Sequence, residues 1–396
     1  MRVAARGESR EMPRIPKPVP ISKSAARRIW ISAQRLDTPS PFGEGPEATR
    51  LAIEHLGYVQ IDTINVIERS HHHILYTRIP AYRRSDLHQV QTIEKSVFEY
   101  WAHALAYIPT RDLRFFLREM KRQREEPHRW FGTVQKAELR KVLRRLRRDG
   151  ALTIRDIDDD VLVEKHHPWA SRKPSKRALQ LAFHRGEVTI SERTGMLKTY
   201  DLMERHFGWE RTPRAPTENE VSEYMLDRAI RSQGIVSLDS VCYMDAPRKP
   251  AMRKIIERRA RRGELVPVAI EGAGKQEHWA PPDPSQATAA ASEVPLVHIL
   301  SPFDPLIIQR KRLKLFFDYD HRFEAYVPKE KRLLGYFALP VLVGDEIVAA
   351  IDLKTDRERG KLQVQKWTWV GSGSRKAHGR RIEEELHRFE PFQLGK

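Results

Sequence analysis

Two polar residues at positions 60 and 62 are of the types that can activate a water molecule. Gln60 and Asp62 belong to the stretch LGYVQIDTINVIERS, which otherwise has the composition of a protein core. Apolar and polar residues alternate from Tyr58 to Asp62, which predicts a short strand with both side chains on one face. There the carboxylate can act as a general base while the amide holds a water. A satisfied polar pair at the end of a strand is the structural alternative.

Three consecutive histidines at positions 71–73 suggest a metal site, but their spacing argues against one. The segment from Glu68 to Arg78 is helical in composition, and successive helical residues point about 100° apart, so the three rings cannot chelate one ion together. His71 and His72, together with Arg69, are candidates for a binding pocket or for phosphate contacts, and core packing is the alternative. We expect no metal and no other cofactor.

Three further residues are expected to have structural roles. Trp101 and His103 are predicted to be core residues near the site, and Asp304, which lies between two prolines in SPFDP, is predicted to stabilise a turn.

The single cysteine, Cys242, excludes an intrachain disulfide framework and any zinc site with several cysteines, which fits a cytoplasmic protein.

Short helices are predicted to surround the strand at position 60. Residues 1–20 are rich in Arg and Pro with little to bury, which indicates a flexible arm. Ser22 or Ser24 can cap a first helix, and a second opens at Pro46 and closes at Gly57. The first helix has an apolar stripe formed by Ile29, Trp30, Ala33 and Leu36. A further short helix is predicted to follow, with Ser85 as its cap.

The charge of the chain favours a polyanionic partner. The 396 residues include 71 Lys and Arg against 53 Asp and Glu, a formal charge of +18. Such an imbalance favours nucleic acid, through release of counterions from the phosphates. No run approaches the roughly 18 apolar residues that a membrane-spanning helix requires.

One basic helix is predicted within QKAELRKVLRRLRR, residues 135–148. Its apolar stripe consists of Leu139, Val142, Leu143 and Leu146. Outside the stripe lie the basic residues Lys136, Arg140, Arg144, Arg147 and Arg148. This basic face is either solvated or in contact with phosphates.

An internal repeat places helices and hairpins in the same order twice. DGALTIRDI (149–157) and QGIVSLDSV (233–241) align, and each continues into a basic helix, a Gly-Glu pair and a β-branched strand with a turn. This order is typical of a winged helix-turn-helix, in which the basic helix and the hairpin wing face nucleic acid. Arg193 and Lys198 lie on the first such hairpin and are predicted to contact phosphates.

In the final third of the chain, after a linker rich in Pro, Ala and Ser at residues 281–295, the predicted secondary structure changes from mainly helices to mainly strands. Strands are predicted in LVHILSPFD, RFEAYVP, LLGYFALPVLVGDEIVAAIDLKTD and LQVQKWTWV, with a hairpin turn at Gly344 and Asp345. They indicate a small antiparallel barrel or sheet, closed by a C-terminal helix, that could serve as a scaffold. The predicted fold is α+β, with tandem winged helix-turn-helix units followed by a C-terminal β-barrel-like domain.

The predicted domain boundaries are an arm at 1–20, a first winged-helix-like unit with the Gln60 and Asp62 motif at 21–132, a second winged helix at 133–212, a third at 213–282, and the C-terminal domain at 283–396.

Several of these stretches together resemble one family. VQIDTINVIERSHHHILYTRIPAY, EYWAHA (Glu99 to Ala104), SPFDPLIIQRKRLKLFFDYDHRFEAYVP and GYFALPVLVGDEIVAAIDLKTDR are similar to the YcaQ/AlkZ-type winged-helix DNA glycosylases, over about residues 22–390. The resemblance implies excision of alkylated purines, including those in interstrand crosslinks. It also implies a catalytic role for the Gln-x-Asp motif of its YcaQ-like branch, matched here by Gln60 and Asp62.

Under this resemblance the expected partner is double-stranded DNA with alkylated purines or crosslinks, bound by a monomer associated with the nucleoid. Two other functions compete with this expectation. A non-catalytic winged-helix regulator would explain the charge and the repeat, but not the Gln-x-Asp segment. A metal-dependent nuclease would need two or three carboxylates that converge on Mg²⁺, and the sequence offers no such cluster.

Overall fold

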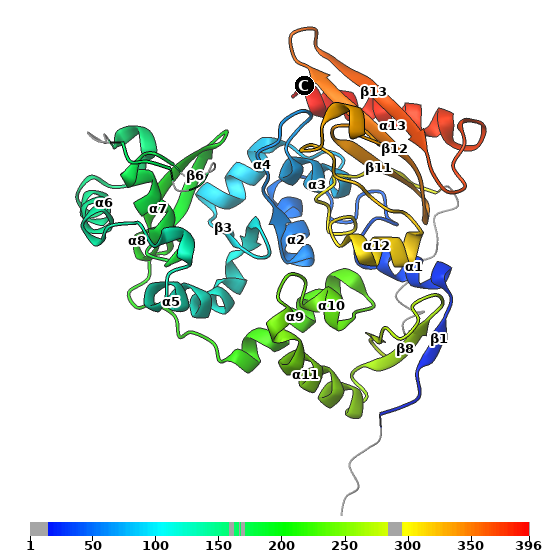
Figure 1. Cartoon of the computed structure of the whole chain (residues 1–396), viewed down its shortest axis with the longest axis horizontal. Coiled ribbons are helices and arrows are strands. Elements are labelled where there is room, and N and C mark those ends of the chain that lie inside the picture. The colour runs from blue at the N-terminus through cyan, green and yellow to red at the C-terminus, as the bar shows by residue number, and fades with distance from the viewer. Residues whose placement is uncertain (1–14, 158–161, 166, 168–170, 284–294, 396) are drawn as a thin grey trace, which may run out of the picture.

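The computed structural model describes residues 15–157, 162–165, 167, 171–283 and 295–395. Within these residues helices and strands mix along the chain in an α+β fold with four separate sheets (Figure 1). None of the described helices is long and apolar enough to cross a membrane.

A three-stranded antiparallel sheet carries position 60. Its strands are β2 (Val59–Gln60), β4 (Leu105–Pro109) and β3 (Val97–Trp101), in that order. The predicted strand is confirmed but is shorter than expected, since Asp62 lies in the loop after β2. The Ile61 N–H still bonds to the Leu105 carbonyl, but beyond Leu105 the partner strand turns away, so the ladder ends.

The helices before β2 have the predicted positions. α1 (Lys23–Ala33) is capped by the Ser22 hydroxyl, and Trp30 on its inner face is fully buried. α2 (Gly45–Leu56) ends at Gly57, whose φ of 78° is a left-handed conformation that glycine adopts without strain.

Two helices follow β2. α3 (Ser70–Arg78) starts two residues later than its predicted segment. The prediction that Ser85 caps the next helix is wrong, because Ser85 is itself the second residue of α4 (Arg84–His88). The cap is formed instead by the Asp86 carboxylate, which accepts the backbone N–H of Arg83 at 2.9 Å.

The basic region and the first predicted repeat form a second group of elements. These are α5 (Leu117–Glu125), α6 (Lys136–Asp149), β5 (Leu152–Thr153), a 3-10 turn (Ile154–Asp156), α7 (Pro174–His184), β6 (Val188–Thr194), β7 (Leu197–Leu202) and α8 (Met203–Phe207). The strands are ordered β5-β7-β6. The apolar stripe predicted for α6 is buried at all four positions.

The second predicted repeat has a similar order of elements. α9 (Glu218–Gln233), α10 (Leu238–Val241) and α11 (Lys249–Arg261) precede the hairpin of β8 (Val266–Ile270) and β9 (His278–Ala280). The predicted arm is partly wrong, because β1 (Val19–Ile21) pairs in parallel with β8. Pro20 is tolerated there because β1 is an edge strand. Residues 1–14 lie outside the described part of the chain.

The C-terminal strands form an open sheet, not a closed barrel. β10 (Val297–Ile299), β11 (Ala338–Val343), β12 (Glu346–Asp356) and β13 (Lys361–Trp369) are ordered β10-β11-β12-β13, and the two outer strands do not pair. The expected turn at Gly344 is confirmed, as is the C-terminal helix α13 (Arg375–Leu394). The predicted linker lies mostly outside the described residues.

The segment between β10 and β11 departs from the prediction. α12 (Arg310–Phe317) was not expected, and RFEAYVP (322–328) is not a strand. The carboxylate of Glu324 instead accepts the backbone N–H groups of Leu333, Leu334 and Gly335, which organises a loop.

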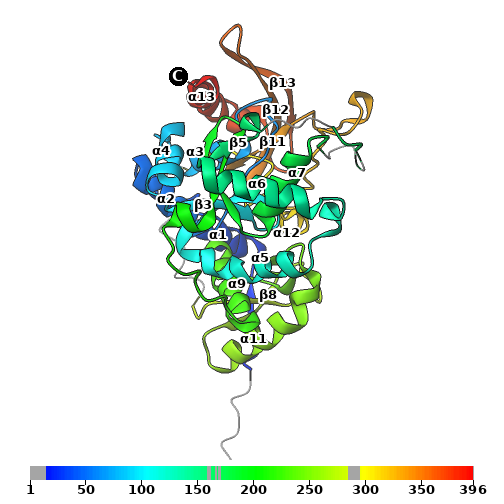
Figure 2. The same cartoon turned by 90° about the vertical axis from the view of Figure 1, so that its left-hand side faces the viewer.

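One hydrophobic core joins the first group of elements to the C-terminal sheet. Ile53 and Leu56 of α2 belong to the same buried cluster as Leu339 and Ile351 of the sheet and Phe389 of α13. In Figure 2, α13 lies above α2, α3 and α4. The C-terminal elements therefore support the segment that follows β2. The division into separate domains stays a prediction.

Candidate active site

Gln60 is held at the end of β2 with one half of its amide free. The residue is 6% exposed, and its backbone carbonyl accepts the hydroxyl of Ser70 at 3.1 Å. Its side-chain Oε1 lies 3.0 Å from Nε2 of His103. Its Nε2 donates to no group in the described chain and is not among the buried polar atoms that lack a partner. The NH₂ group therefore has no protein partner and is reached by solvent, although the residue as a whole is buried.

Asp62 presents one free carboxylate oxygen. Its Oδ1 accepts the backbone N–H of Ile64 at 2.8 Å, which forms a tight turn after β2. The side chain is partly exposed, and no described residue donates a hydrogen bond to Oδ2. The two residues thus bring a free amide donor and a free carboxylate acceptor to one short segment.

The C-terminal elements brace the loop that carries Asp62. The backbone N–H of Thr355 on β12 donates to the Val66 carbonyl at 2.9 Å, and Arg357 donates to the Asn65 side chain at 3.0 Å. The Gln393 side chain of α13 accepts the Glu68 N–H at 2.6 Å. The expectation of a scaffold role for this region gains a physical basis, because the loop is anchored at both the sheet and the helix.

The three histidines of α3 have different partners, and only the rings of His71 and His72 lie together, with centroids 4.3 Å apart. His73 bonds to the Ile299 carbonyl at 2.7 Å, and His72 bonds through Nδ1 to the Tyr82 hydroxyl at 2.7 Å. Burial lowers the pKa of both to about 4 and holds the pKa of His71 well below its ordinary value. His71 is buried, and the centroids of its ring and the Tyr107 ring lie 5.6 Å apart. Pocket roles for His71, His72 and Arg69 stay a prediction.

His103 joins the site to a neighbouring cavity. It lies in the turn between β3 and β4, and its ring meets the edges of Tyr58 and Tyr243 at 5.0 and 5.2 Å between centroids. Burial, followed by the nearby Arg228 charge, lowers the pKa of His103 to about 4. A cavity of about 280 Å³ opens beside the ring, between this turn, α9 and the segment after α10. Sequence reasoning placed His103 near the site as a core residue and missed its bond to Gln60; the EYWAHA motif was the available signal.

Trp101, in the same motif, was expected in the core but is 42% exposed. It is the last residue of β3, where the strand passes into the turn, and its ring stacks on His184 at 5.3 Å. The prediction of a core position is therefore wrong for Trp101.

Arg193 and Lys198 lie on the predicted hairpin, but their side chains turn inward. Arg193 forms an ion pair with the fully buried Glu99 of β3, with Nη2 and Oε2 2.7 Å apart. Burial disfavours its charge, but Glu99 more than compensates and keeps the pKa of Arg193 above its ordinary value. Lys198 lies over the Phe183 ring at 5.5 Å, and burial lowers its pKa to about 8. These contacts give both residues structural roles, and their contact with phosphate stays a prediction.

The exposed basic face of α6 contrasts with that of α11. Arg140, Arg144 and Arg147 are exposed, and the ion pairs of α6 are made by Arg145 and Arg148, both to Asp149. On α11 the arginines pair with neighbouring carboxylates, as in Arg253 with Glu277, Arg258 with Glu223, Arg259 with Asp227 and Arg261 with Glu257. Of these two helices, α6 therefore carries the larger uncompensated charge.

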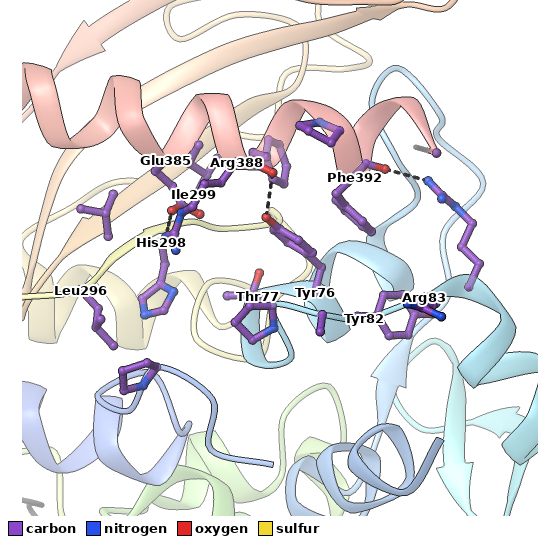
Figure 3. Close-up of a pocket in the computed structure, with 18 residues that line it drawn as sticks. Tyr76, Thr77, Tyr82, Arg83, Leu296, His298, Ile299, Glu385, Arg388 and Phe392 are labelled. Carbon is purple, nitrogen blue, oxygen red and sulfur yellow. Dashed lines mark hydrogen bonds and ion pairs between the residues drawn. The ribbon is translucent and has the colours of Figure 1, made fainter. Parts of the chain in front are cut away.

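A larger cavity, of about 750 Å³, lies away from the Gln-x-Asp segment. It is bordered by the end of α3, β10 and α13, and Figure 3 shows the Tyr76 hydroxyl donating to the Arg388 carbonyl across it. Neither Gln60, Asp62 nor His103 lines it. This larger cavity is therefore separate from the candidate site.

No group of three or more His, Cys, Asp or Glu side chains in the described residues is arranged to hold a metal ion.

Asp304 is fully buried, and its Oδ1 accepts the Leu306 N–H at 2.9 Å, so the predicted turn is confirmed. Asp304 also pairs with the fully buried Arg78 at 2.7 Å, which the sequence did not indicate.

Two comparisons with known proteins cover most of the chain. Residues 53–392 match the family described as DNA glycosylase AlkZ-like. The fold is similar to that of the Streptomyces sahachiroi DNA glycosylase AlkZ, with a TM-score of 0.62 at 16% identity over 95% of this chain and 97% of that chain. That identity makes the second comparison a likeness of fold alone. The family match covers most of the chain and includes the Gln60 and Asp62 segment. The chain therefore belongs to the AlkZ-like family of DNA glycosylases, enzymes of DNA repair.

Proposed function

We propose that this DNA glycosylase excises alkylated, cationic purines, with Asp62 and Gln60 as its catalytic residues. The observation that carries the proposal is the pairing of two unengaged groups on one braced segment: the amide nitrogen of Gln60 and Oδ2 of Asp62. A donor and an acceptor of this kind suit a water molecule that must be both held and deprotonated.

The chemistry of the lesion explains why one carboxylate suffices. Alkylation at N7 or N3 makes the purine cationic, so the electron pair of the C1′–N9 bond neutralises the departing base without any protonation. The sugar develops an oxocarbenium-like charge, which the Asp62 carboxylate stabilises. Water held by Gln60 then bonds to C1′ and gives its proton to Asp62, leaving an abasic site.

This mechanism is monofunctional, because water and not an amine attacks the sugar. It extends to interstrand crosslinks between two guanine N7 atoms, since release of either base unhooks the strands. The repeated order of helices followed by a hairpin supports tandem winged-helix units that hold the duplex, and we propose that a monomer acts in the cytoplasm on nucleoid DNA.

Purified protein incubated with a duplex that carries one N7-methylguanine tests the proposal. We expect free methylated base, an abasic site, and strand breakage only after alkali treatment, with equal yield in the presence of a chelator. A regulator without catalytic activity would bind the duplex and release no base. Breakage without alkali, abolished by the chelator, would indicate a nuclease.

Gln60→Ala is expected to slow excision on the order of 10- to 100-fold, because the water loses the amide that positions it. Duplex affinity should stay within a few fold, since the phosphate contacts lie elsewhere. Single-turnover rates at saturating enzyme measure the effect on chemistry separately from binding. An unchanged rate would remove Gln60 from the mechanism.

The basic face of α6 is expected to supply phosphate contacts. The triple variant Arg140→Ala, Arg144→Ala, Arg147→Ala should weaken binding to damaged and undamaged duplex alike, and lower the salt slope by roughly three, about one for each contact. Fluorescence anisotropy across a salt series measures both.

The matched control removes three charges from α13, which belongs to none of the predicted winged units. Arg375→Ala, Lys376→Ala, Arg380→Ala changes the net charge equally, but both arginines already face carboxylates at 3.2 and 2.9 Å. Equal losses in the two triple variants would show a general charge effect and not a binding face on α6.

A further inference from the structure

The bond between Gln60 and His103 determines which half of the Gln60 amide faces the reaction. Oε1 is engaged with His103 Nε2 at 3.0 Å, and the NH₂ group is left without a protein partner. Rotation of the amide by 180° would exchange the two ends and offer an acceptor in place of a donor. The partner of Oε1 therefore decides what Gln60 can do.

The surroundings of His103 hold its ring in place and keep it neutral. The rings of Tyr58 and Tyr243 both pack against it in edge-to-face contacts, and the Ala102 N–H bonds to the Ala104 carbonyl at 2.9 Å across its turn. Two cations lie near this cluster: Arg228, whose guanidinium lies over the Tyr58 ring at 5.5 Å, and Arg310, whose charge acts on Tyr243. With its pKa lowered to about 4, the imidazole carries one ring proton at neutral pH.

We propose that His103 is a positioning residue, whose Nε2–H donates to Oε1 of Gln60 and so directs the Gln60 NH₂ group toward the catalytic water. This inference rests on the proposed function and adds a residue to it. The neutral ring has only one N–H, so the arrangement requires the Nε2–H tautomer and leaves Nδ1 as an acceptor.

The tautomer can be observed without any substrate. Long-range ¹H–¹⁵N spectra of the full chain labelled at histidine nitrogen distinguish a protonated Nε2 from a protonated Nδ1, with His103→Gln providing the assignment. We expect His103 in the Nε2–H form from pH 6 to 8. The Nδ1–H form would overturn the proposal, because Gln60 would then have to turn its NH₂ group toward the ring.

Two conservative substitutions test the kinetic role. A glutamine amide reaches as far from the backbone as imidazole Nε2, whereas an asparagine amide reaches only as far as Nδ1. His103→Gln should therefore keep most of the single-turnover excision rate, while His103→Asn and His103→Ala should lose about 10- to 100-fold with little change in duplex affinity. Equal loss in all three, or none, contradicts the positioning role.

A double-mutant cycle shows whether His103 acts through Gln60. In a Gln60→Ala background, His103→Ala should cause no further loss of rate, since the amide it orients is gone. Independent losses that multiply would instead assign His103 a separate role and overturn the inference.

The two levels of the proposal fail in different ways. If the unmodified protein releases no alkylated purine, the proposed function fails, while the tautomer still reports on the orientation of Gln60. If it releases the base, and His103→Ala does so at the same rate, the glycosylase proposal stands and the positioning role is wrong.

Discussion

Replacement of Asp62 by asparagine is expected to lower the rate of base excision by on the order of 10² to 10⁴, the range typical for loss of a general base. Asparagine keeps a side-chain oxygen that can accept the Ile64 N–H, so the turn after β2 is preserved. What disappears is the negative charge and the basic oxygen. Affinity for the duplex should stay within a few fold.

The measurement is a single-turnover excision rate on a duplex with one N7-methylguanine, together with anisotropy for binding. Asp86→Asn is a suitable control, since Asp86 also accepts a backbone N–H at a local cap and lies on α4 away from the proposed water. It should retain the rate of the unmodified enzyme. An Asp62→Asn enzyme that excises at the normal rate would show that the carboxylate is not the base.

Replacement of Asp304 by asparagine is expected to lower the free energy of unfolding by about 3 to 5 kcal/mol, because it leaves a buried cation without its partner. Arg78 and Asp304 are both fully buried, and Arg78 also bonds to the Gln34 carbonyl at 3.0 Å and to its side chain at 2.8 Å. Asparagine can still accept the Leu306 N–H, so the loss isolates the charge.

Urea denaturation followed by tryptophan fluorescence measures this effect. The control is Asp318→Asn, whose ion pair with Lys23 is exposed and is worth at most about 1 kcal/mol. The excision rate of folded Asp304→Asn should equal that of the unmodified enzyme. A loss of rate in stable, folded protein would instead give Asp304 a role in the chemistry and contradict its purely structural role.

The sequence by itself determined most of the local elements and singled out the candidate site residues. Hydrophobic spacing placed α1, α2 and α6, and Gly57 and Gly344 marked the ends of local elements, since these signals depend on neighbours within a few residues. The types and spacing of Gln60 and Asp62 likewise indicated a water-activating pair. Composition indicated the nucleic-acid partner.

Only the tertiary structure decided how distant segments meet. The bond of His103 to Gln60, the pair of Arg193 with Glu99, and that of Arg78 with Asp304 join residues 43, 94 and 226 positions apart. No local pattern records such partners, because each depends on how separate elements pack. For the same reason the pairing of β1 with β8 escaped prediction, and the sequence left open whether the C-terminal strands form a barrel or a sheet. Strand composition indicates that a strand forms, while the edge it joins is decided by the packing of the whole chain.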